Sequence, residues 1–259
     1  MKLTTLMLSA AVALGPIASA NVVAQTNEPQ TGTVKNIVLV HGAFVDGSGW
    51  KPVYEILKHD GYNVTLVQEP LTSLADDVAA TKRVLAIQPG PTILVAHSYG
   101  GTVITEAGTD SHVAGLVYIA AHEPDTGETE SANGKRIPAV AAAPLKTADG
   151  SLYLDPARFH QDFAADLPAA QANFEAHSQI PTAAQVFTTP VTDPAWKVKP
   201  SWALVATDDR IISPDLERMY AARAHSHTVE VQGASHSVYE SRPKEVAALI
   251  EQAAGHAQD

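Results

Sequence analysis

Cysteine is absent from the 259-residue sequence. This absence excludes disulfide bonds, thiol catalysis and a lipid anchor attached through cysteine, so stability must come from the hydrophobic core alone. Basic residues are scarce as well, since 17 Lys and Arg stand against 28 Asp and Glu, which gives a net charge of −11. Nucleic acids and anionic membranes are bound through clustered Lys and Arg, and we therefore expect neither as a partner.

Long hydrophobic runs are also rare. The apolar run at the N-terminus is short and interrupted by a Gly-Pro pair, whereas a membrane anchor needs roughly 20 apolar residues. Residues 1–20 combine a Lys, this apolar run and a final Ala-Ser-Ala, which is typical of a signal peptide cleaved after Ala20, with cleavage after Ala24 as the alternative. We therefore expect a periplasmic or secreted protein without stable membrane insertion, whose mature chain begins with a disordered tail at 21–32.

Beyond residue 32, β-rich runs alternate with helical segments. The pattern predicts strands at 34–40, 62–68, 91–96, 113–120, 202–206 and 228–231. It predicts helices at 49–59, 73–86, 102–107, 214–224 and 242–253. This alternation indicates one α/β domain with a mostly parallel central sheet, built from residues 33–122 and 198–259. We expect the irregular segment 123–197 to form a small helical cap over the carboxyl edge of the sheet, where open α/β sheets bind ligands.

A nucleophile elbow is the most informative motif. The β-rich run 92–96 leads directly into His97 and Ser98, and Gly100 and Gly101 follow. Small residues allow a sharp turn from strand to helix that exposes the Ser98 hydroxyl at the helix N-terminus. The alternative is that Ser98 only caps the helix that follows.

A serine nucleophile needs a histidine base held by an acid, and in elbow-type hydrolases the chain order is Ser, acid, His. Asp209 follows the predicted strand 202–206, and His236 follows the last predicted strand in a loop of small residues. We therefore predict Ser98, His236 and Asp209 as a catalytic triad. Asp208 is the alternative acid, and the unused aspartate is expected to cap the helix that begins near Pro214.

Acyl transfer also needs N–H donors for the oxyanion. The backbone N–H of Tyr99 directly follows the nucleophile, and the loop His41-Gly42-Ala43-Phe44 after the first strand offers a second donor, which we assign to Ala43. A plain tight turn is the alternative for this loop. His41 is interpreted as structural.

Four segments carry a family resemblance: Val38-Leu39-Val40-His41-Gly42-Ala43, the elbow around Ser98, Ala206-Thr207-Asp208-Asp209-Arg210 and Gly233-Ala234-Ser235-His236. They resemble the α/β-hydrolase superfamily, and within it the branch of plant methylesterases and hydroxynitrile lyases with its bacterial exported relatives. The resemblance covers residues 34–253 and is weakest in the cap. It implies a sheet flanked by helices with a small cap insertion.

The branch contains both esterases and lyases. The lyases carry Thr at the position of Gly42 and, at the position of Ser237, a Lys that holds the cyanide leaving group. The absence of both residues implies ester hydrolysis. Phe44, Phe187 and Trp196, together with the Tyr99 ring, are candidates to line the acyl pocket, with ordinary core packing as the alternative.

The expected function is hydrolysis of a small carboxylic ester through an acyl-enzyme intermediate, with no metal or organic cofactor. A lyase or a cofactor-free perhydrolase using the same triad is an alternative, because a fold does not determine the reaction. A ligand receptor with a nearly silent hydrolase site is an alternative from another class. The physiological ester, the oligomeric state and the mobility of the cap stay open.

Overall fold

The computed structural model describes residues 32–257. The predicted signal peptide at 1–20 and the predicted tail, except its last residue, lie outside the described residues. Within the described part of the chain, no helix has the length and apolar character that crossing a membrane requires.

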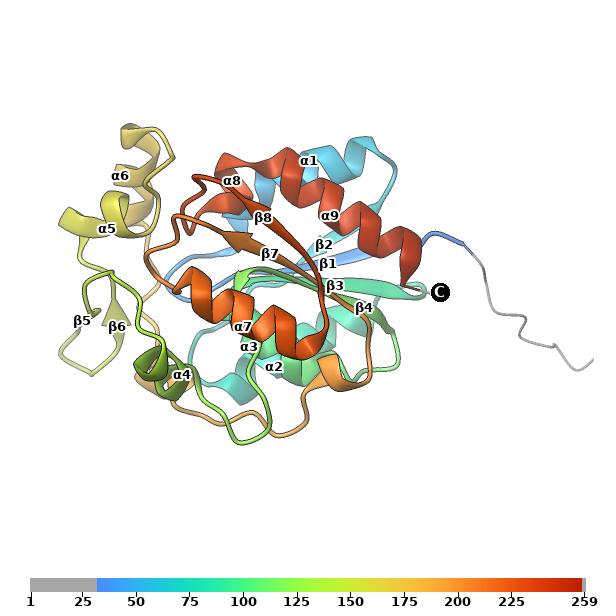
Figure 1. Ribbon diagram of the computed structural model, residues 1–259, viewed down its shortest axis with the longest axis horizontal. Helices are drawn as coiled ribbons and strands as arrows, with labels where there is room; N and C mark the ends of the chain where they lie inside the picture. The colour runs from blue at the N-terminus through green and yellow to red at the C-terminus, as the bar shows by residue number, and fades with distance from the viewer. Residues whose placement is uncertain (1–31, 258–259) are drawn as a thin grey trace, which may run out of the picture. The chain divides into compact units, whose positions relative to one another are not determined.

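Six parallel strands form the central sheet, in the order β2-β1-β3-β4-β7-β8 (Figure 1). Their bounds are β1 Asn36–Val40, β2 Asn63–Leu66, β3 Thr92–Ser98, β4 Val113–Ala121, β7 Ser201–Ala206 and β8 His227–Val231. The expected parallel α/β sheet is therefore confirmed. Parallel strands all end at the same edge, so the loops that follow β1, β3, β4, β7 and β8 meet there.

Helices cover both faces of the sheet (Figure 1). One face carries α1 Lys51–His59, α8 Val238–Ser241 and α9 Pro243–His256, and the other carries α2 Leu74–Leu85, α3 Gly100–Ala107 and α7 Pro214–Ala224. A short 3-10 helix, η1 Gly47–Trp50, precedes α1. Both faces are buried, which explains why the strands read as continuous runs of Val, Ile and Leu.

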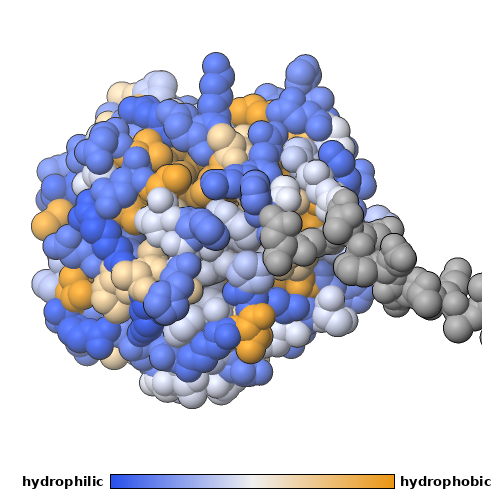
Figure 2. Space-filling view, turned by 45° about the vertical axis from the view of Figure 1, so that its right-hand side comes forward, coloured by the Kyte–Doolittle hydropathy of each residue, from blue (hydrophilic) through white to orange (hydrophobic). Residues whose placement is uncertain are grey.

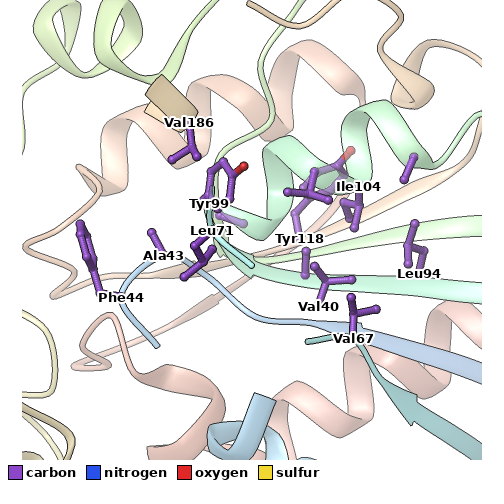
Figure 3. Packing of buried hydrophobic residues seen from close by; sticks show 14 of the residues in the cluster. Val40, Ala43, Phe44, Val67, Leu71, Leu94, Tyr99, Ile104, Tyr118 and Val186 are labelled. Carbon is purple, nitrogen blue, oxygen red and sulfur yellow. The ribbon is translucent and has the colours of Figure 1, made fainter. Parts of the chain in front are cut away.

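The strand side chains alternate between two hydrophobic clusters. Ile37 packs toward α1 and α9, whereas Val38 and Val40 pack toward α2 and α3. Figure 3 shows the second cluster, in which Ile104 of α3 lies close to the strands that carry Val40 and Leu94. Because a one-residue shift would exchange the two clusters, this alternation keeps each strand in register and holds the carboxyl edge in place.

The segment between β4 and β7 holds the predicted cap. Its elements are α4 Glu130–Arg136, β5 Leu145–Lys146, β6 Leu152–Tyr153, α5 Pro156–Asp162, α6 Ala169–His177, η2 Ala184–Phe187 and η3 Ala195–Lys197. Strands β5 and β6 pair antiparallel in a small sheet of their own. Elements β5, β6, α5 and α6 lie together beyond one end of the central sheet (Figure 1).

The surface is largely hydrophilic on the face shown in Figure 2, where hydrophobic side chains occur in small separate groups. The large exposed hydrophobic residues, such as Ile87, Phe174 and Val198, come from separate parts of the chain. Single exposed apolar side chains are normal for a folded protein. The cavity at the carboxyl edge of the sheet is therefore a better candidate for a binding site than this face.

Candidate active site

Ser98 occupies a strained turn between β3 and α3. Its φ of 55° lies in the left-handed region, which is unfavourable for a residue with a side chain. Gly100 and Gly101 permit the turn, since a Cβ at Gly100 would lie 2.5 Å from the carbonyl oxygen of His41. The turn leaves Ser98 facing a cavity although the residue is only 7% exposed. This is the backbone geometry that the elbow motif predicts.

Gly42 allows the loop after β1 to approach the serine closely. A Cβ at this position would lie 2.7 Å from Ser98 Cβ and 3.2 Å from His97 Nδ1. Any side chain here would force the loop or the elbow to move. The absence of a Cβ at Gly42 is therefore what lets the backbone of this loop lie beside the serine.

Asp209 and His236 form a buried pair. His236 Nδ1 lies 2.5 Å from Asp209 Oδ2, and both side chains are inaccessible to solvent. Asp209 Oδ1 accepts hydrogen bonds from the backbone N–H groups of Ile211 and Ile212, at 2.7 and 2.9 Å. Because Nδ1 donates to the carboxylate, the neutral ring presents Nε2 as an acceptor. Among the described residues, Nε2 has no hydrogen-bond partner.

His97 holds the backbone of His236 in place. Its Nε2 donates to the His236 carbonyl oxygen at 2.9 Å, and the two ring centroids lie 4.5 Å apart. Burial and the neighbouring His236 keep the pKa of His97 well below its usual value. His97 is therefore a neutral positioning residue, a role that its sequence context did not indicate.

Glu217 of α7 is a second buried carboxyl group close to Asp209. Its Oε2 accepts a hydrogen bond from the Ala206 N–H at 3.2 Å. Burial, followed by the charge of Asp209, raises the pKa of Glu217 well above its usual value. Glu217 therefore keeps its proton to a higher pH than an exposed glutamate does.

Asp208 takes neither of its two possible roles. The side chain is exposed and does not pair with His236, and α7 begins after Ser213 without any side-chain cap. The expectation that the unused aspartate caps this helix is wrong. The backbone explains the outcome, because the Asp208 N–H is held by the carbonyl oxygen of Ala234 and the loop turns the next residue inward.

The loop after β1 is clamped to the cap through Phe44. The Phe44 N–H donates to Thr182 Oγ1 at 3.1 Å, and the Phe44 carbonyl oxygen accepts from the Ile180 N–H at 2.9 Å. Phe44 itself has a φ of 70°. Within residues 32–257, the N–H groups of Ala43 and Tyr99 donate to no protein acceptor. Both N–H groups therefore keep a free hydrogen-bonding capacity, and Ala43 also lines the cavity that Ser98 faces, whereas Tyr99 is fully buried.

His41 supports this loop from below. Its Nδ1 donates to the Gly42 carbonyl oxygen at 2.9 Å, and its Nε2 accepts from the Glu69 N–H at 3.0 Å. Burial lowers the pKa of His41, so the ring is neutral. These contacts agree with the interpretation of His41 as structural.

Ser98 opens into a cavity of about 440 Å³ at the carboxyl edge of the sheet. Phe44 and Phe187 line it, with their rings stacked 5.7 Å apart, as expected for pocket residues. The other apolar lining residues are Ala43, Ala139, Ala141, Ala142, Ala143, Pro144, Leu152, Leu154, Ala184 and Ile211. The cavity therefore lies between the loop after β1 and the segment between β4 and β7.

Two aromatic candidates lie elsewhere. Trp196 does not line the cavity, because its indole Nε1 donates to the Pro124 carbonyl oxygen at 3.0 Å and Arg223 stacks over its ring. The Tyr99 ring is also buried, and its hydroxyl donates to Asp77 at 2.7 Å. Figure 3 shows this ring beside Val186. Both side chains therefore pack in the protein interior, and the prediction that they line the acyl pocket is wrong.

Two lining residues were missed from the sequence, His122 and Glu130. His122 directly follows β4, as a residue at the carboxyl edge should, and this position is a signal that could have been used. Glu130 lies on α4 in the cap and carries no comparable signal. Within residues 32–257, no group of three or more His, Asp or Glu side chains is arranged to hold a metal ion.

The sequence matches a family model described as the Alpha/beta hydrolase family over residues 37–249. The match covers most of the chain, and the protein therefore belongs to the alpha/beta hydrolase family. This membership confirms the family that the motifs resemble. No curated protein matches the sequence.

Solved structures show the same fold at low sequence identity. A pyrethroid hydrolase from Sphingobium faniae JZ-2 is 22% identical, with a TM-score of 0.70 over 86% of this chain and 98% of that one. A methylesterase from Arabidopsis is 19% identical, with a TM-score of 0.70 over 85% and 98%. Tomato methylketone synthase I, complexed with 2-tridecanone, is 19% identical, with a TM-score of 0.73 over 86% and 98%. These similarities show that the chain shares its fold with all three proteins, one of which is a plant methylesterase.

Proposed function

We propose that the protein hydrolyses small carboxylic esters, with Ser98 as nucleophile, His236 as general base and Asp209 as the acid that orients it. The buried contact of 2.5 Å between His236 Nδ1 and Asp209 Oδ2 is the observation that carries this proposal. It fixes the tautomer in which Nε2 accepts a proton, which is what a serine nucleophile requires.

The reaction proceeds in two halves. The Ser98 hydroxyl attacks the ester carbonyl carbon while His236 Nε2 takes its proton, and the Ala43 and Tyr99 N–H groups donate to the oxyanion. His236 then returns the proton to the departing alcohol, which leaves an acyl group on Ser98. A water molecule, deprotonated by His236, attacks the acyl group and releases the carboxylic acid.

The cavity supports a small and largely apolar substrate. Its volume of about 440 Å³ lies in the lower part of the range for small-molecule sites. Alanine side chains from 139–143, Leu152 of β6 and the nearby Leu154 provide much of the wall. Such a wall favours short acyl and alkyl groups over long chains or charged groups.

Hydrolysis of p-nitrophenyl acetate and butyrate tests the proposal. We expect turnover by the wild type and a loss of roughly 10⁴-fold or more in kcat for Ser98→Ala. Ser201→Ala is the matched control, because Ser201 is also buried but lies at the opposite end of the sheet, at the start of β7. We expect this control to stay within about threefold of the wild type. Equal turnover by the wild type and Ser98→Ala would reject the proposal.

A further inference from the structure

A second histidine and carboxyl pair lies in the same cavity as Ser98. Strand β4 places His122 there, because Ala121 pairs with Ser98 across the sheet and the His122 N–H donates to the Ser98 carbonyl oxygen at 3.1 Å. The side chain of His122 lines the cavity together with Glu130 of α4. The position of His122 relative to the nucleophile is therefore set by the sheet, and α4 brings Glu130 to it.

The two side chains face each other without forming a tight bond. His122 Nε2 and Glu130 Oε2 lie 3.4 Å apart, and the side chains are 12% and 4% exposed. This separation is long for a hydrogen bond between nitrogen and oxygen. Glu130 Oε1 accepts from the Thr102 hydroxyl, whereas His122 Nδ1 lies at an equally long distance of 3.4 Å from the Tyr220 hydroxyl. Nε2 and Oε2 therefore keep hydrogen-bonding capacity for a third group.

Burial leaves both members of the pair uncharged at neutral pH. It raises the pKa of Glu130 to about 8, against the lowering effect of the Thr102 hydroxyl. Burial, and then the nearby His236, lowers the pKa of His122 to about 3. A neutral imidazole and a neutral carboxyl group each have one proton, so Nε2 and Oε2 can present one donor and one acceptor.

Most of the other residues that line the cavity are apolar, and His122 and Glu130 are a buried polar pair among them. The other polar lining residues are Ser98, Ser131, Lys146 and Thr188, of which the last three are more exposed than Glu130. A neutral donor and acceptor in a largely apolar wall match a hydroxyl group, which donates and accepts at the same time. An ammonium group would lose its hydration there without gaining an opposite charge, and a carboxylate would find a cation among the lining residues only at the exposed Lys146.

We propose that His122 and Glu130 form a subsite for a hydroxyl group of the ester substrate, so that the preferred substrates are hydroxy esters. The inference rests on the ester hydrolysis proposed above and names its substrate class. The hydroxyl donates to one of the two side chains and accepts from the other. His122 and Glu130 are thus specificity-determining residues, distinct from the triad.

The test compares esters in which a hydroxyl group replaces a methyl group of similar size. Methyl 3-hydroxybutyrate against methyl 3-methylbutyrate places the difference in the acyl half, and 2-hydroxyethyl butyrate against propyl butyrate places it in the alcohol half. Titration of the released acid at constant pH gives the rate of hydrolysis. The measured quantity is the ratio of the two kcat/KM values within each pair. We expect the wild type to prefer the hydroxyl ester by about tenfold in one of the two pairs.

Variants of the subsite should change this ratio. In His122→Phe and Glu130→Leu the preference should fall toward one, whereas Glu130→Gln should keep most of it, because an amide also offers a donor and an acceptor. Thr188→Val is the matched control: it removes a hydroxyl from the same cavity and should keep the ratio within twofold. Melting temperatures identify variants that do not fold. If one of His122→Phe and Glu130→Leu fails to fold, the other is sufficient to test the subsite. A wild-type ratio near one in both pairs, or a preference that survives His122→Phe, would overturn the proposal.

Binding of the four esters to the Ser98→Ala variant tests the hydroxyl subsite independently of the proposed ester hydrolysis. If the wild type hydrolyses none of the four esters, the esterase function fails, and ligand-observed NMR still compares their dissociation constants. Tighter binding of the hydroxyl ester to Ser98→Ala, lost when His122→Phe is added, supports the subsite without any turnover. Equal binding of both members of each pair overturns it.

Discussion

The two histidine and carboxyl pairs of this protein differ in almost every respect, although both lie at the carboxyl edge of one sheet. His236 and Asp209 are 2.5 Å apart, and Asp209 also accepts from two backbone N–H groups. His122 and Glu130 are 3.4 Å apart, and Glu130 accepts from a single hydroxyl. The same two functional groups are therefore suited to different roles according to the donors around the carboxyl group.

The difference shows what a buried carboxyl group needs in order to orient an imidazole. A group that accepts several hydrogen bonds is held as an acceptor and fixes the tautomer of the ring. A group that burial leaves neutral can donate as well as accept, so it suits recognition of a neutral ligand. Replacing each carboxyl group by the corresponding amide separates the two cases.

Asp209→Asn should have the largest effect. The amide no longer accepts reliably from His236 Nδ1, so the ring can adopt the tautomer in which Nε2 bears the proton and cannot act as base. We expect kcat to fall by roughly 10⁴-fold while the fold is retained. Steady-state kinetics with p-nitrophenyl butyrate and a circular dichroism spectrum check this. A loss of less than tenfold would mean that the two pairs are not functionally different.

Glu130→Gln should change stability and not chemistry. The folded protein holds the pKa of Glu130 at about 8, above the ordinary value of 4.5, so folding binds a proton between these pH values. The wild type therefore loses stability relative to the variant as pH rises from 4.5 to 8, by a total on the order of 5 kcal/mol, and the difference stays constant above pH 8. Urea unfolding at several pH values measures it. A difference that does not grow with pH would show that Glu130 is ionised in the folded state.

His97→Phe tests the support behind the first pair. Phe fills the space between His236 and Tyr239 but removes the N–H that donates to the His236 carbonyl oxygen. We expect kcat to fall about tenfold with KM within twofold, because the bond positions the base and does not bind substrate. A parallel rise in KM with unchanged kcat would contradict this role.

Glu217→Gln should have the smallest effect. Burial and the charge of Asp209 raise the pKa of Glu217 and so favour its protonated form, which an amide resembles, so we expect little change near Asp209. We expect activity within about threefold of the wild type from pH 6 to pH 8. The rate of p-nitrophenyl butyrate hydrolysis measures it, and a loss of more than tenfold would show that a Glu217 proton is needed beside Asp209.

Much of the fold was predictable because its signals are local. The β-rich runs marked all six strands of the central sheet, and α7 begins at Pro214 and ends at Ala224 as predicted. The contact between Asp209 and His236 also agrees with the chain order, since each residue lies in the loop that follows a strand at the same edge. In such a sheet, the place of a residue along the sequence largely determines its place in space.

Other contacts were not predictable because they depend on packing between distant segments. His122 resembles any loop histidine, and only the hydrogen bond between Thr102 and Glu130 shows how α4 brings its partner to the cavity. Trp196 looked like a pocket aromatic, yet the Pro124 carbonyl oxygen and Arg223 hold it in the interior. The two-residue strands β5 and β6 are too short to show any periodicity.

The clamp at Phe44 makes the cap and the oxyanion loop one cooperative unit. An opening that breaks the hydrogen bonds from Phe44 to Ile180 and Thr182 also releases the backbone at Ala43. Amide hydrogen exchange at Ile180 therefore reports the fraction of molecules in which the donor loop is assembled. A substitution that stabilises the two hydrogen bonds of Phe44 should therefore slow exchange at Ile180 and keep the loop at Ala43 in place in a larger fraction of the molecules.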